Sequence, residues 1–502
     1  LASSAPSASR GTMRDAGAEL DRFALRWLRR AKVPGASLSV VQRGRPDLDR
    51  GYGFRDREAR LPASARTVYG LASVTKSFTA LAILRLGEEG ALSTQDPVVR
   101  HLPEFGTPDP KATPKIRLHH FLTHTSGLPP LPSIYYTAAR SLVRDPPYDP
   151  RVARRVGVDP DHPPIDTYEQ ILEYLRTTRY RLLGPPGRVF SYSNEGFGLL
   201  GAVIERASGR TYESYVGEEI LRPAGMRSST FDAGVLRRFP EVTTLYSPKR
   251  TGARHPLVPS QEWWDDTCLR ACGGLRSTTE DLSQYLRIFL DGGRVGRERI
   301  IGPASLRKMF TPHVEIGLGR YYGYGVAIRP DYHGTPLVYH DGGLPGVSST
   351  LVALPEKHLG AAVLSNAEQV PAELLAMAAV NQRLGLPLET PLVDVPRPVP
   401  ARGPLGRYEG WYCSGEGIWL TVSALPDSLR VDFRGIELTG RNLRYRPAGP
   451  DAFVRWHHGV PAYLRFLPGP VGRTSAVFLG WRVVRRRDPR GLARARRGDF
   501  VW

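Results

Sequence analysis

The stretch Gly70–Ala80, which reads GLASVTKSFTA, places Ser73 three residues before Lys76 at the start of an apolar helix. Lysine is rare in this chain, because seven lysines stand among 69 basic residues and the other 62 are arginines. A position that needed positive charge alone would be expected to carry arginine. The lysine therefore indicates a chemical requirement that arginine does not meet.

A helix that begins at Ser73 points backbone N–H groups and the positive end of its dipole at the serine hydroxyl. Lys76 lies on the same helix face, within reach of that oxygen. A neutral amine can accept the hydroxyl proton, whereas an arginine guanidinium stays protonated. The alternative is a helix cap at Ser73 with a solvated Lys76. The run Phe78–Leu86 is apolar on nearly every face and favours a buried helix whose N-terminus opens into a site.

A second stretch, Gly187–Asn194, leads from a short extended piece into a helix predicted over Gly196–Ala207. Tyr192 is placed to act as a phenolate base beside cationic groups, and Asn194 can donate to a substrate carbonyl. The alternative is that Ser193 and Asn194 cap the helix while Tyr192 packs.

The third stretch, Tyr339–Gly343, places His340 at a strand end before small residues. Glycines at 342 and 343 let a substrate lie against the strand edge, and a backbone N–H there can form an oxyanion hole with that of Ser73. Taken alone, the stretch favours a hairpin with Asp341–Gly342 at its turn.

Together these three motifs resemble the serine β-lactamase and penicillin-binding protein superfamily. The class C branch is most similar, with its D-alanyl-D-alanine carboxypeptidase, D-aminopeptidase and esterase relatives (peptidase S12-like). The resemblance covers Asp21–Leu386 and includes Leu122–Leu128, Gly273–Leu275 and Tyr324–Val326. It implies an α+β fold of the β-lactamase/transpeptidase type, in which an antiparallel sheet covered by helices lies against an all-helical lobe.

The resemblance also implies roles for individual residues. Ser73 would form an acyl-enzyme, with Lys76 and Tyr192 as proton shuttles. Asn194 would bind substrate, together with the third motif (His340, Gly342 and Gly343). The Ser73 and Gly343 N–H groups would bind the oxyanion. No metal or other cofactor is implied.

The third motif departs from the β-lactamases of this branch, which carry Lys-Thr-Gly where this chain has His340-Asp341-Gly342. Loss of the lysine weakens recognition of a substrate carboxylate, and His-x-Gly is more usual among the peptidases and esterases. We therefore expect a serine hydrolase of small esters or amides, such as D-amino-acid peptides. The alternatives are a non-catalytic penicillin-binding sensor and a true β-lactamase.

Composition shifts divide the chain into three parts. Residues 1–20 read as a leader or linker, 21–394 as the hydrolase domain, and 395–502 as a β-barrel domain similar to a lipocalin. The linker Val393–Pro404 is rich in proline and arginine. Before it, the proline-rich segment Pro129–Pro164 is predicted to be a loop that forms a lid or rim over the site.

The net charge of +20 is compatible with anionic partners, but the arginines are spread along the whole chain, and we expect no nucleic-acid site. No apolar run approaches the roughly 20 residues of a membrane span. The polar start at residues 2–9 suggests an extracytoplasmic protein. Cys268, Cys272 and Cys413 lack zinc-site spacing and are expected to be buried thiols. The oligomeric state is left open.

Overall fold

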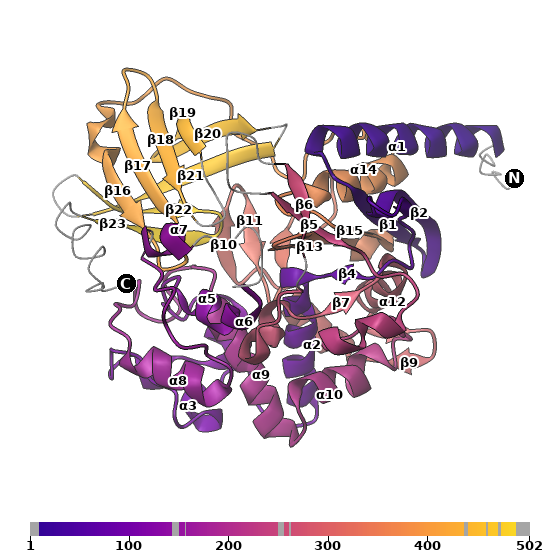
Figure 1. Cartoon of the computed structure of the whole chain (residues 1–502), viewed down its shortest axis with the longest axis horizontal. Coiled ribbons are helices and arrows are strands. Elements are labelled where there is room, and N and C mark those ends of the chain that lie inside the picture. Colours follow the sequence, from indigo (N-terminus) through magenta and orange to yellow (C-terminus); the bar gives the residue numbers. More distant parts are fainter. Residues whose placement is uncertain are drawn as a thin grey trace, which may run out of the picture.

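The computed structural model describes residues 10–142, 150–155, 157–248, 256–260, 263–435, 440–457, 460–469 and 473–487. Three predictions lie partly outside these residues: the start of the leader (1–9), the proline-rich run 145–149, and the end of the C-terminal domain (488–502). Figure 1 shows a central sheet between helices, with a separate barrel packed beside it.

The central sheet has nine antiparallel strands in the order β10-β11-β12-β13-β14-β15-β1-β2-β3. Residues alternate between its two faces: on β15, Ala361 and Val363 pack on one side, and Ala362 and Leu364 on the other. Burial of both faces explains the nearly continuous apolar sequence of the central strands. The strands are β1 (Gly35–Gln42), β2 (Arg45–Asp56), β3 (Leu61–Pro62), β10 (Val314–Gly317), β11 (Arg320–Tyr322), β12 (Ala327–Arg329), β13 (Leu337–Leu344), β14 (Val347–Leu354) and β15 (Leu359–Ser365).

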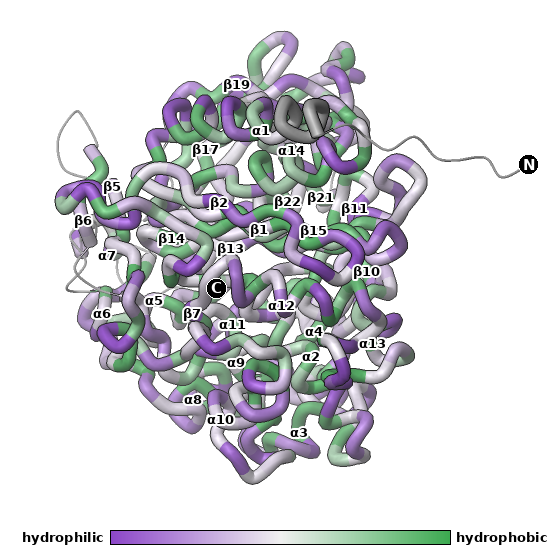
Figure 2. Tube along the Cα trace, turned by 90° about the vertical axis from the view of Figure 1, so that its right-hand side faces the viewer, coloured by the Kyte–Doolittle hydropathy of each residue, from purple (hydrophilic) through white to green (hydrophobic). Residues whose placement is uncertain are grey.

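Helices cover both faces of this sheet (Figure 2). Helices α1 (Arg10–Ala31) and α14 (Ala372–Leu384) pack on one face, and α2 (Thr75–Glu88) and α12 (Thr279–Leu290) on the other. The predicted helix at Leu20–Arg30 is confirmed, although α1 begins earlier. Together with the barrel described below, this architecture confirms the predicted fold class.

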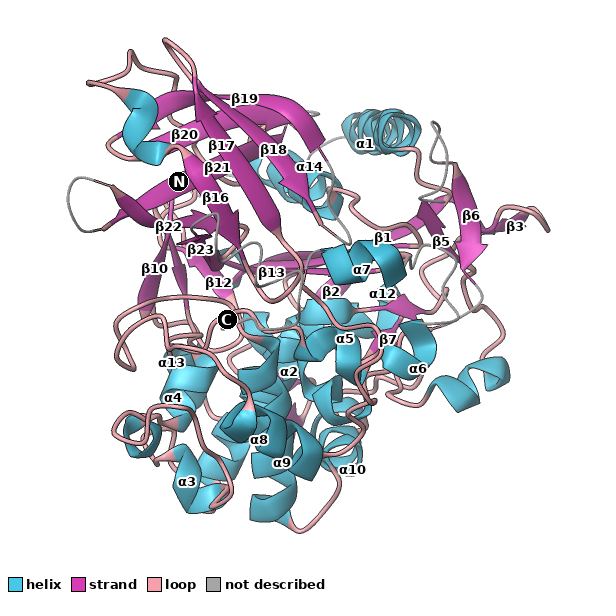
Figure 3. Ribbon diagram, turned by 60° about the vertical axis from the view of Figure 1, so that its left-hand side comes forward, coloured by secondary structure: helices cyan, strands magenta, loops and turns pink. Residues whose placement is uncertain are grey.

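Most of the helical lobe lies on the side of α2 that faces away from the central sheet (Figure 3). The predicted loop over Pro129–Pro164 is wrong in part, because it contains the short helices α5, α6 and α7. The lobe and its neighbours comprise α3 (Val98–His101), α4 (Leu118–Leu122), α5 (Ser133–Thr137), α6 (Ala139–Leu142), α7 (Pro150–Arg155), α8 (Tyr168–Thr177), α9 (Asn194–Ser208), α10 (Tyr212–Val216), α11 (Arg270–Gly273) and α13 (Pro303–Met309).

Shorter elements connect these layers. A π-helix follows α10 at Gly217–Leu221. Three two-stranded ribbons are β4 (Tyr69–Gly70) with β7 (Arg276–Ser277), β5 (Leu245–Pro248) with β6 (Leu257–Ser260), and β8 (Arg294–Val295) with β9 (Glu298–Arg299). The 3-10 helices are η1 (Ala72–Val74), η2 (Thr113–Lys115), η4 (Ala233–Arg238), η5 (Thr267–Leu269), η6 (Pro355–Lys357) and η7 (Leu405–Tyr408).

The hairpin predicted at Asp341–Gly342 is wrong in the position of its turn. Strands β13 and β14 are antiparallel, as expected, but their pairing continues through Gly343 to Leu344, which lies opposite Val347. The turn falls at Pro345–Gly346, where Gly346 has a φ of +68°. The left-handed residue that the turn requires is therefore Gly346, and the Asp-Gly-Gly run stays within the strand.

A closed eight-stranded barrel forms the C-terminal domain, as the sequence predicts. Its interior is apolar and includes Leu420, Val431 and Phe466. Closure removes the exposed strand edges that an open sheet would leave. The strands are β16 (Gly410–Cys413), β17 (Trp419–Ala424), β18 (Leu429–Arg434), β19 (Gly440–Gly449), β20 (Ala452–His457), β21 (Val460–Pro468), β22 (Thr474–Leu479) and β23 (Arg482–Arg487).

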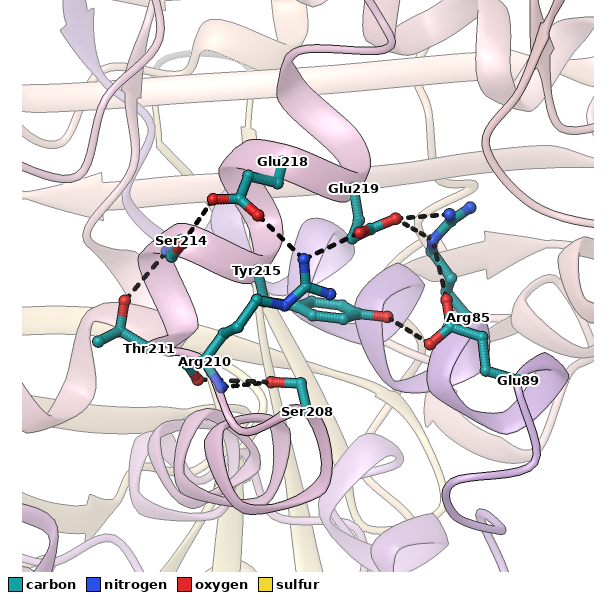
Figure 4. Close-up of polar contacts among 9 residues, drawn as sticks. All are labelled: Arg85, Glu89, Ser208, Arg210, Thr211, Ser214, Tyr215, Glu218 and Glu219. Carbon is teal, nitrogen blue, oxygen red and sulfur yellow. Dashed lines mark hydrogen bonds and ion pairs between the residues drawn. The ribbon is translucent and has the colours of Figure 1, made fainter.

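A cluster of ion pairs fixes the far end of α2 to the helical lobe (Figure 4). Arg85 on α2 contacts Glu219 of the π-helix at 2.5 Å, and Arg210 lies 3.0 Å from both Glu218 and Glu219. Burial alone would raise the pKa of Glu219, but hydrogen bonds from Arg210 and Arg85 bring it below its usual value. This end of the helix is thus anchored by charge, and the other end opens toward the sheet.

Within the described residues, no helix combines the length and apolar character of a membrane span. The same residues hold no group of three or more His, Cys, Asp or Glu side chains arranged to bind a metal ion. The three cysteines are buried and free, which confirms the prediction of buried thiols.

We predict that Phe78→Ala lowers the free energy of unfolding by about 3–5 kcal/mol. Phe78 on α2 is fully buried and stacks on Tyr285 with ring centroids 3.7 Å apart. Leu25→Ala on α1 is the control, because Leu25 is 46% exposed and its loss should change stability by at most about 0.5 kcal/mol. Denaturant unfolding measures both variants. Equal losses would contradict the central position of α2 in the core.

Candidate active site

Ser73 lies on η1, which runs directly into α2. The preceding residue, Ala72, has a φ of +45°, a left-handed conformation that costs energy for any residue with a Cβ. Neither η1 nor α2 has a side-chain cap, so the interpretation of Ser73 as a helix cap is wrong. The half-buried hydroxyl instead faces Lys76 and the cleft described below.

Lys76 is completely buried, so its interpretation as a solvated residue is also wrong. Its Nζ lies 3.2 Å from Ser73 Oγ, 2.9 Å from Asn194 Oδ1 and 2.7 Å from the carbonyl oxygen of Cys272. An ammonium group has three N–H donors, and each has an acceptor here. A neutral amine would keep two donors on Asn194 and Cys272 and direct its lone pair at the serine. The geometry therefore serves both protonation states.

Asn194 is the first residue of α9, and Ser193 caps that helix by accepting a hydrogen bond from Gly196 N–H at 3.2 Å. The capping alternative is thus right for Ser193, whereas the carbonyl oxygen of Asn194 is directed at Lys76. The cap fixes the start of α9 and with it the position of the Asn194 amide.

The phenol oxygen of Tyr192 is buried and has no hydrogen-bond partner among the described residues. Its ring lies 4.7 Å from Lys76 Nζ on the hydrolase domain and 4.9 Å from Arg482 Cζ on the barrel. A buried hydroxyl without a partner is uncommon in folded proteins and often marks a functional site. Catalytic hydrogen bonds are often long in ligand-free structures and tighten when substrate binds.

The third motif lies along β13, which passes beside η1. A Cβ on Gly342 would fall 2.3 Å from the carbonyl oxygen of Leu71 and 2.3 Å from Ser349 Oγ, so only glycine allows this approach. A Cβ on Gly343 would meet open space, and Gly343 lines the cleft. The motif thus brings the strand edge close to Ser73.

His340 is 1% exposed and does not line the cleft. Its ring belongs to a buried hydrogen-bond chain that the sequence analysis missed. Ser193 N–H donates to His124 Nδ1 at 3.1 Å, and His124 Nε2 lies 3.3 Å from Tyr322 Oη. Tyr322 Oη lies 2.9 Å from His340 Nε2, and His340 Nδ1 lies 2.6 Å from the carbonyl oxygen of Asp341.

The backbone groups at the two ends of this hydrogen-bond chain set the direction of its hydrogen bonds. His124 Nδ1 accepts from an N–H and His340 Nδ1 must donate to a carbonyl, so His124 donates to Tyr322 and Tyr322 donates to His340. Burial, reinforced by the charge of Lys76, lowers the pKa of His340 to about 3 and that of His124 well below its usual value. Both rings are therefore neutral, and the chain joins the residues around Tyr192 to strand β13.

A cleft of about 530 Å³ opens above Ser73, within the size range of small-molecule sites. Tyr192, Asn194, Gly342 and Gly343 line it together with Ser73. The helical lobe contributes Ile134 and Tyr135, from the segment predicted to form a rim, as well as Trp264 and Asp266.

The barrel also forms part of this cleft, through the turn between β22 and β23. The carbonyl oxygen of Trp481 accepts a hydrogen bond from Tyr192 N–H at 2.8 Å. The Trp481 ring packs against those of Tyr192 and His340, and Arg482 is paired with Glu416. No local signal in the sequence pointed to Trp481 or Arg482. Only the fold shows that this turn reaches Tyr192.

Residues 16–384 match the Beta-lactamase family model, a range that includes all three motifs. The chain belongs to the beta-lactamase family.

Individual relatives extend this result. Protein flp of Staphylococcus aureus (strain MW2) is 27% identical over 369 residues, which are 71% of this chain and 65% of the relative's length. The chain thus spans less than two thirds of that protein. Esterase EstB of Burkholderia gladioli is 34% identical over 226 residues, 44% of this chain and 53% of the esterase.

The octameric penicillin-binding protein homologue from Pyrococcus abyssi is 30% identical to this chain, with a TM-score of 0.64. That match covers 93% of this chain and 99% of the homologue, so it extends into the C-terminal barrel.

We predict that Tyr322→Phe slows covalent labelling of Ser73 by a fluorophosphonate. The change removes the acceptor of His124 and the donor to His340, which leaves two buried ring nitrogens unpaired at a cost of about 1–3 kcal/mol. Tyr332→Phe is the matched control, because it removes a buried phenol whose hydrogen bond goes to Asn381 on α14, outside the three motifs. Both variants should lose stability in thermal unfolding, and only Tyr322→Phe should lower the rate in stopped-flow labelling. Equal labelling rates of Tyr322→Phe and Tyr332→Phe would contradict a positioning role for the hydrogen-bond chain.

Proposed function

We propose that the protein is a serine hydrolase that forms an acyl-enzyme on Ser73 and cleaves ester or amide bonds of small substrates. The observation that carries the proposal is the contact of Lys76 Nζ with Ser73 Oγ, at 3.2 Å in a buried setting. The cleft above the serine offers space for a small acyl group and its leaving group.

In the acylation step, neutral Lys76 accepts the hydroxyl proton as Ser73 Oγ attacks the carbonyl carbon. The backbone N–H groups of Ser73 and Gly343 then stabilise the oxyanion, and Asn194 orients the substrate. Tyr192, whose hydroxyl has no competing partner, gives its proton to the leaving group and takes the serine proton from Lys76 in its place. In deacylation, water attacks the acyl carbonyl carbon while the same groups accept one of its protons, and they deliver that proton to Ser73 Oγ as the ester bond breaks and the acid leaves.

In this proposal the third motif acts differently from the Lys-Thr-Gly motif of the β-lactamases. His340 is neutral and faces the protein interior, so the structure favours a positioning role for its side chain over a direct substrate contact. Gly342 and Gly343 supply the strand edge. The absence of a lysine at this position supports an esterase or peptidase in preference to a β-lactamase.

Ser73→Ala should abolish labelling by a fluorophosphonate and turnover of every substrate. The control is Ser77→Ala, which removes a buried serine one turn further along α2, bonded to Val74 and Tyr285. Intact-mass spectrometry reports the label, and p-nitrophenyl esters, D-aminoacyl anilides, D-Ala-D-Ala peptides and a chromogenic cephalosporin report turnover. Stable labelling without turnover would favour the penicillin sensor, and efficient cephalosporin hydrolysis would favour a β-lactamase.

Lys76→Arg should slow acylation by about 10²–10⁴-fold, the usual contribution of a general base. The variant keeps the charge but cannot accept a proton. Tyr192→Phe should lower the acylation rate by a similar factor. If both groups relay one proton, the rate of the double variant should fall by much less than the product of the two single factors. Circular dichroism checks the fold. A Lys76→Arg protein that acylates at the wild-type rate would contradict the proposed base.

A further inference from the structure

The cleft reverses the charge balance of the rest of the protein. The whole chain carries a net charge of +20. Among the described residues that line the cleft, however, four are carboxylic acids and two are arginines. They are Asp266, Asp341, Glu368 and Glu416, with Arg434 and Arg482. A cleft that gathers acids in an arginine-rich protein favours a substrate with positive charge.

Asp266 Oδ1 and Glu416 Oε1 both lack a hydrogen-bond partner among the described residues, but the other oxygen of Glu416 is bound to an arginine. Glu416 is paired with Arg482, and Asp341 accepts a hydrogen bond from Thr350 Oγ1 at 2.8 Å. The Oδ1 atom of Asp266 is buried and has no hydrogen-bond partner among the described residues. A buried carboxylate without a partner is costly, and a bound cation would remove that cost.

The hydrogen bonds of the cations near Asp266 go to other groups, although the buried Nε of Arg276 has no partner among the described residues. Arg270 holds Asp265 with two hydrogen bonds of 2.8 and 2.7 Å. The Arg276 Nη atoms donate to the carbonyl oxygens of Phe231, Gly274 and Trp264. Lys76 directs its donors at Ser73, Asn194 and Cys272.

These neighbours also set the charge of Asp266. Burial, followed by the nearby charge of Asp265, raises its pKa to about 7, against the lowering effects of Arg276, Arg270 and Lys76. The carboxyl group is therefore partly ionised at neutral pH, and a bound ammonium ion would favour the ionised form.

Asp266 is linked through the backbone to a residue that holds Lys76. It directly precedes η5, which leads into α11, and α11 carries the Cys272 carbonyl that holds Lys76. Trp264 and Tyr135 line the same cleft and supply apolar surface beside the acid. A substrate bound to Ser73 thus has a carboxylate and two aromatic side chains within the same cavity.

We propose that Asp266 binds the ammonium group of the substrate and makes the enzyme selective for acyl donors with a free amino group, such as amino-acid esters, amino-acid amides and unblocked peptides. This inference rests on the proposed hydrolase function. It narrows the substrate class to aminoacyl compounds and assigns recognition of the amine to a residue outside the three motifs.

The test compares the rates at which the enzyme hydrolyses alanine methyl ester and N-acetylalanine methyl ester. Both enantiomers of each ester are used, and the products are measured by chromatography. Wild-type enzyme should prefer the free amine. Asp266→Asn should lower kcat/KM for the free amine about 10–100-fold, mainly through KM, and leave the acetylated ester within about twofold. Glu368→Gln, a second change of a cleft acid to its amide, is the control and should keep the wild-type preference. The same preference in wild type and Asp266→Asn would overturn the proposal.

The pH profile gives a second readout. For the free-amine ester, kcat/KM of wild type should fall as the pH drops below about 7, because Asp266 becomes protonated. The acetylated ester and the Asp266→Asn variant should lack this step. A step of equal size in all three cases would assign it to another group and contradict the role of Asp266.

Binding to Ser73→Ala separates this proposal from the proposed function, because that variant cannot acylate. Calorimetry should show tighter binding of alaninamide than of N-acetylalaninamide, and the preference should disappear in Ser73→Ala/Asp266→Asn. Equal binding of both amides to Ser73→Ala would overturn the ammonium site even if Ser73 is the nucleophile. Fluorophosphonate labelling of Asp266→Asn should persist and shows that the serine remains competent.

Discussion

The buried amine of Lys76 is the constraint on which the rest of the site depends. An amine with no solvent exposure, in either protonation state, is tolerated only when its N–H donors are hydrogen-bonded. Its three acceptors, on Ser73, Asn194 and Cys272, come from η1, from the first turn of α9 and from α11, which lie far apart in the sequence. Each segment must therefore reach its place before the lysine is satisfied, and the nucleophile is positioned by the same contacts.

Other features of the fold follow from bringing those segments together. Ala72 adopts a left-handed backbone so that Ser73 faces the lysine. Gly342 lacks a side chain so that β13 can pass beside η1. An arginine could not replace Lys76, because five planar donors do not match three acceptors grouped around one nitrogen. The rarity of lysine in this chain thus gave a correct indication of a special environment.

Much of the hydrolase fold could be predicted because its signals are local. The apolar helix after Ser73 and the strand over β14 follow from the spacing of apolar residues, whereas the closed C-terminal barrel is expected from a resemblance to lipocalin-like barrels. The predicted turn at Asp341–Gly342 was wrong because a local preference for Asp-Gly turns yielded to the pairing of β13 with β14. The inward orientation of His340 could not be read from its motif, because Tyr322 and His124 reach it from elsewhere in the sequence.

The barrel contacts the proposed active site, although the sequence marks it as a separate domain. A proline-rich linker and a change in composition mark it as an independent unit, yet its β22–β23 turn packs on Tyr192. The Tyr192 ring consequently lies between Lys76 from one domain and Arg482 from the other. Two cations on opposite sides of a domain boundary act on one phenol, so the electrostatic environment of the proposed proton shuttle depends on docking of the barrel. Any change that loosened this docking would alter the chemistry at Tyr192 as well as the shape of the cleft.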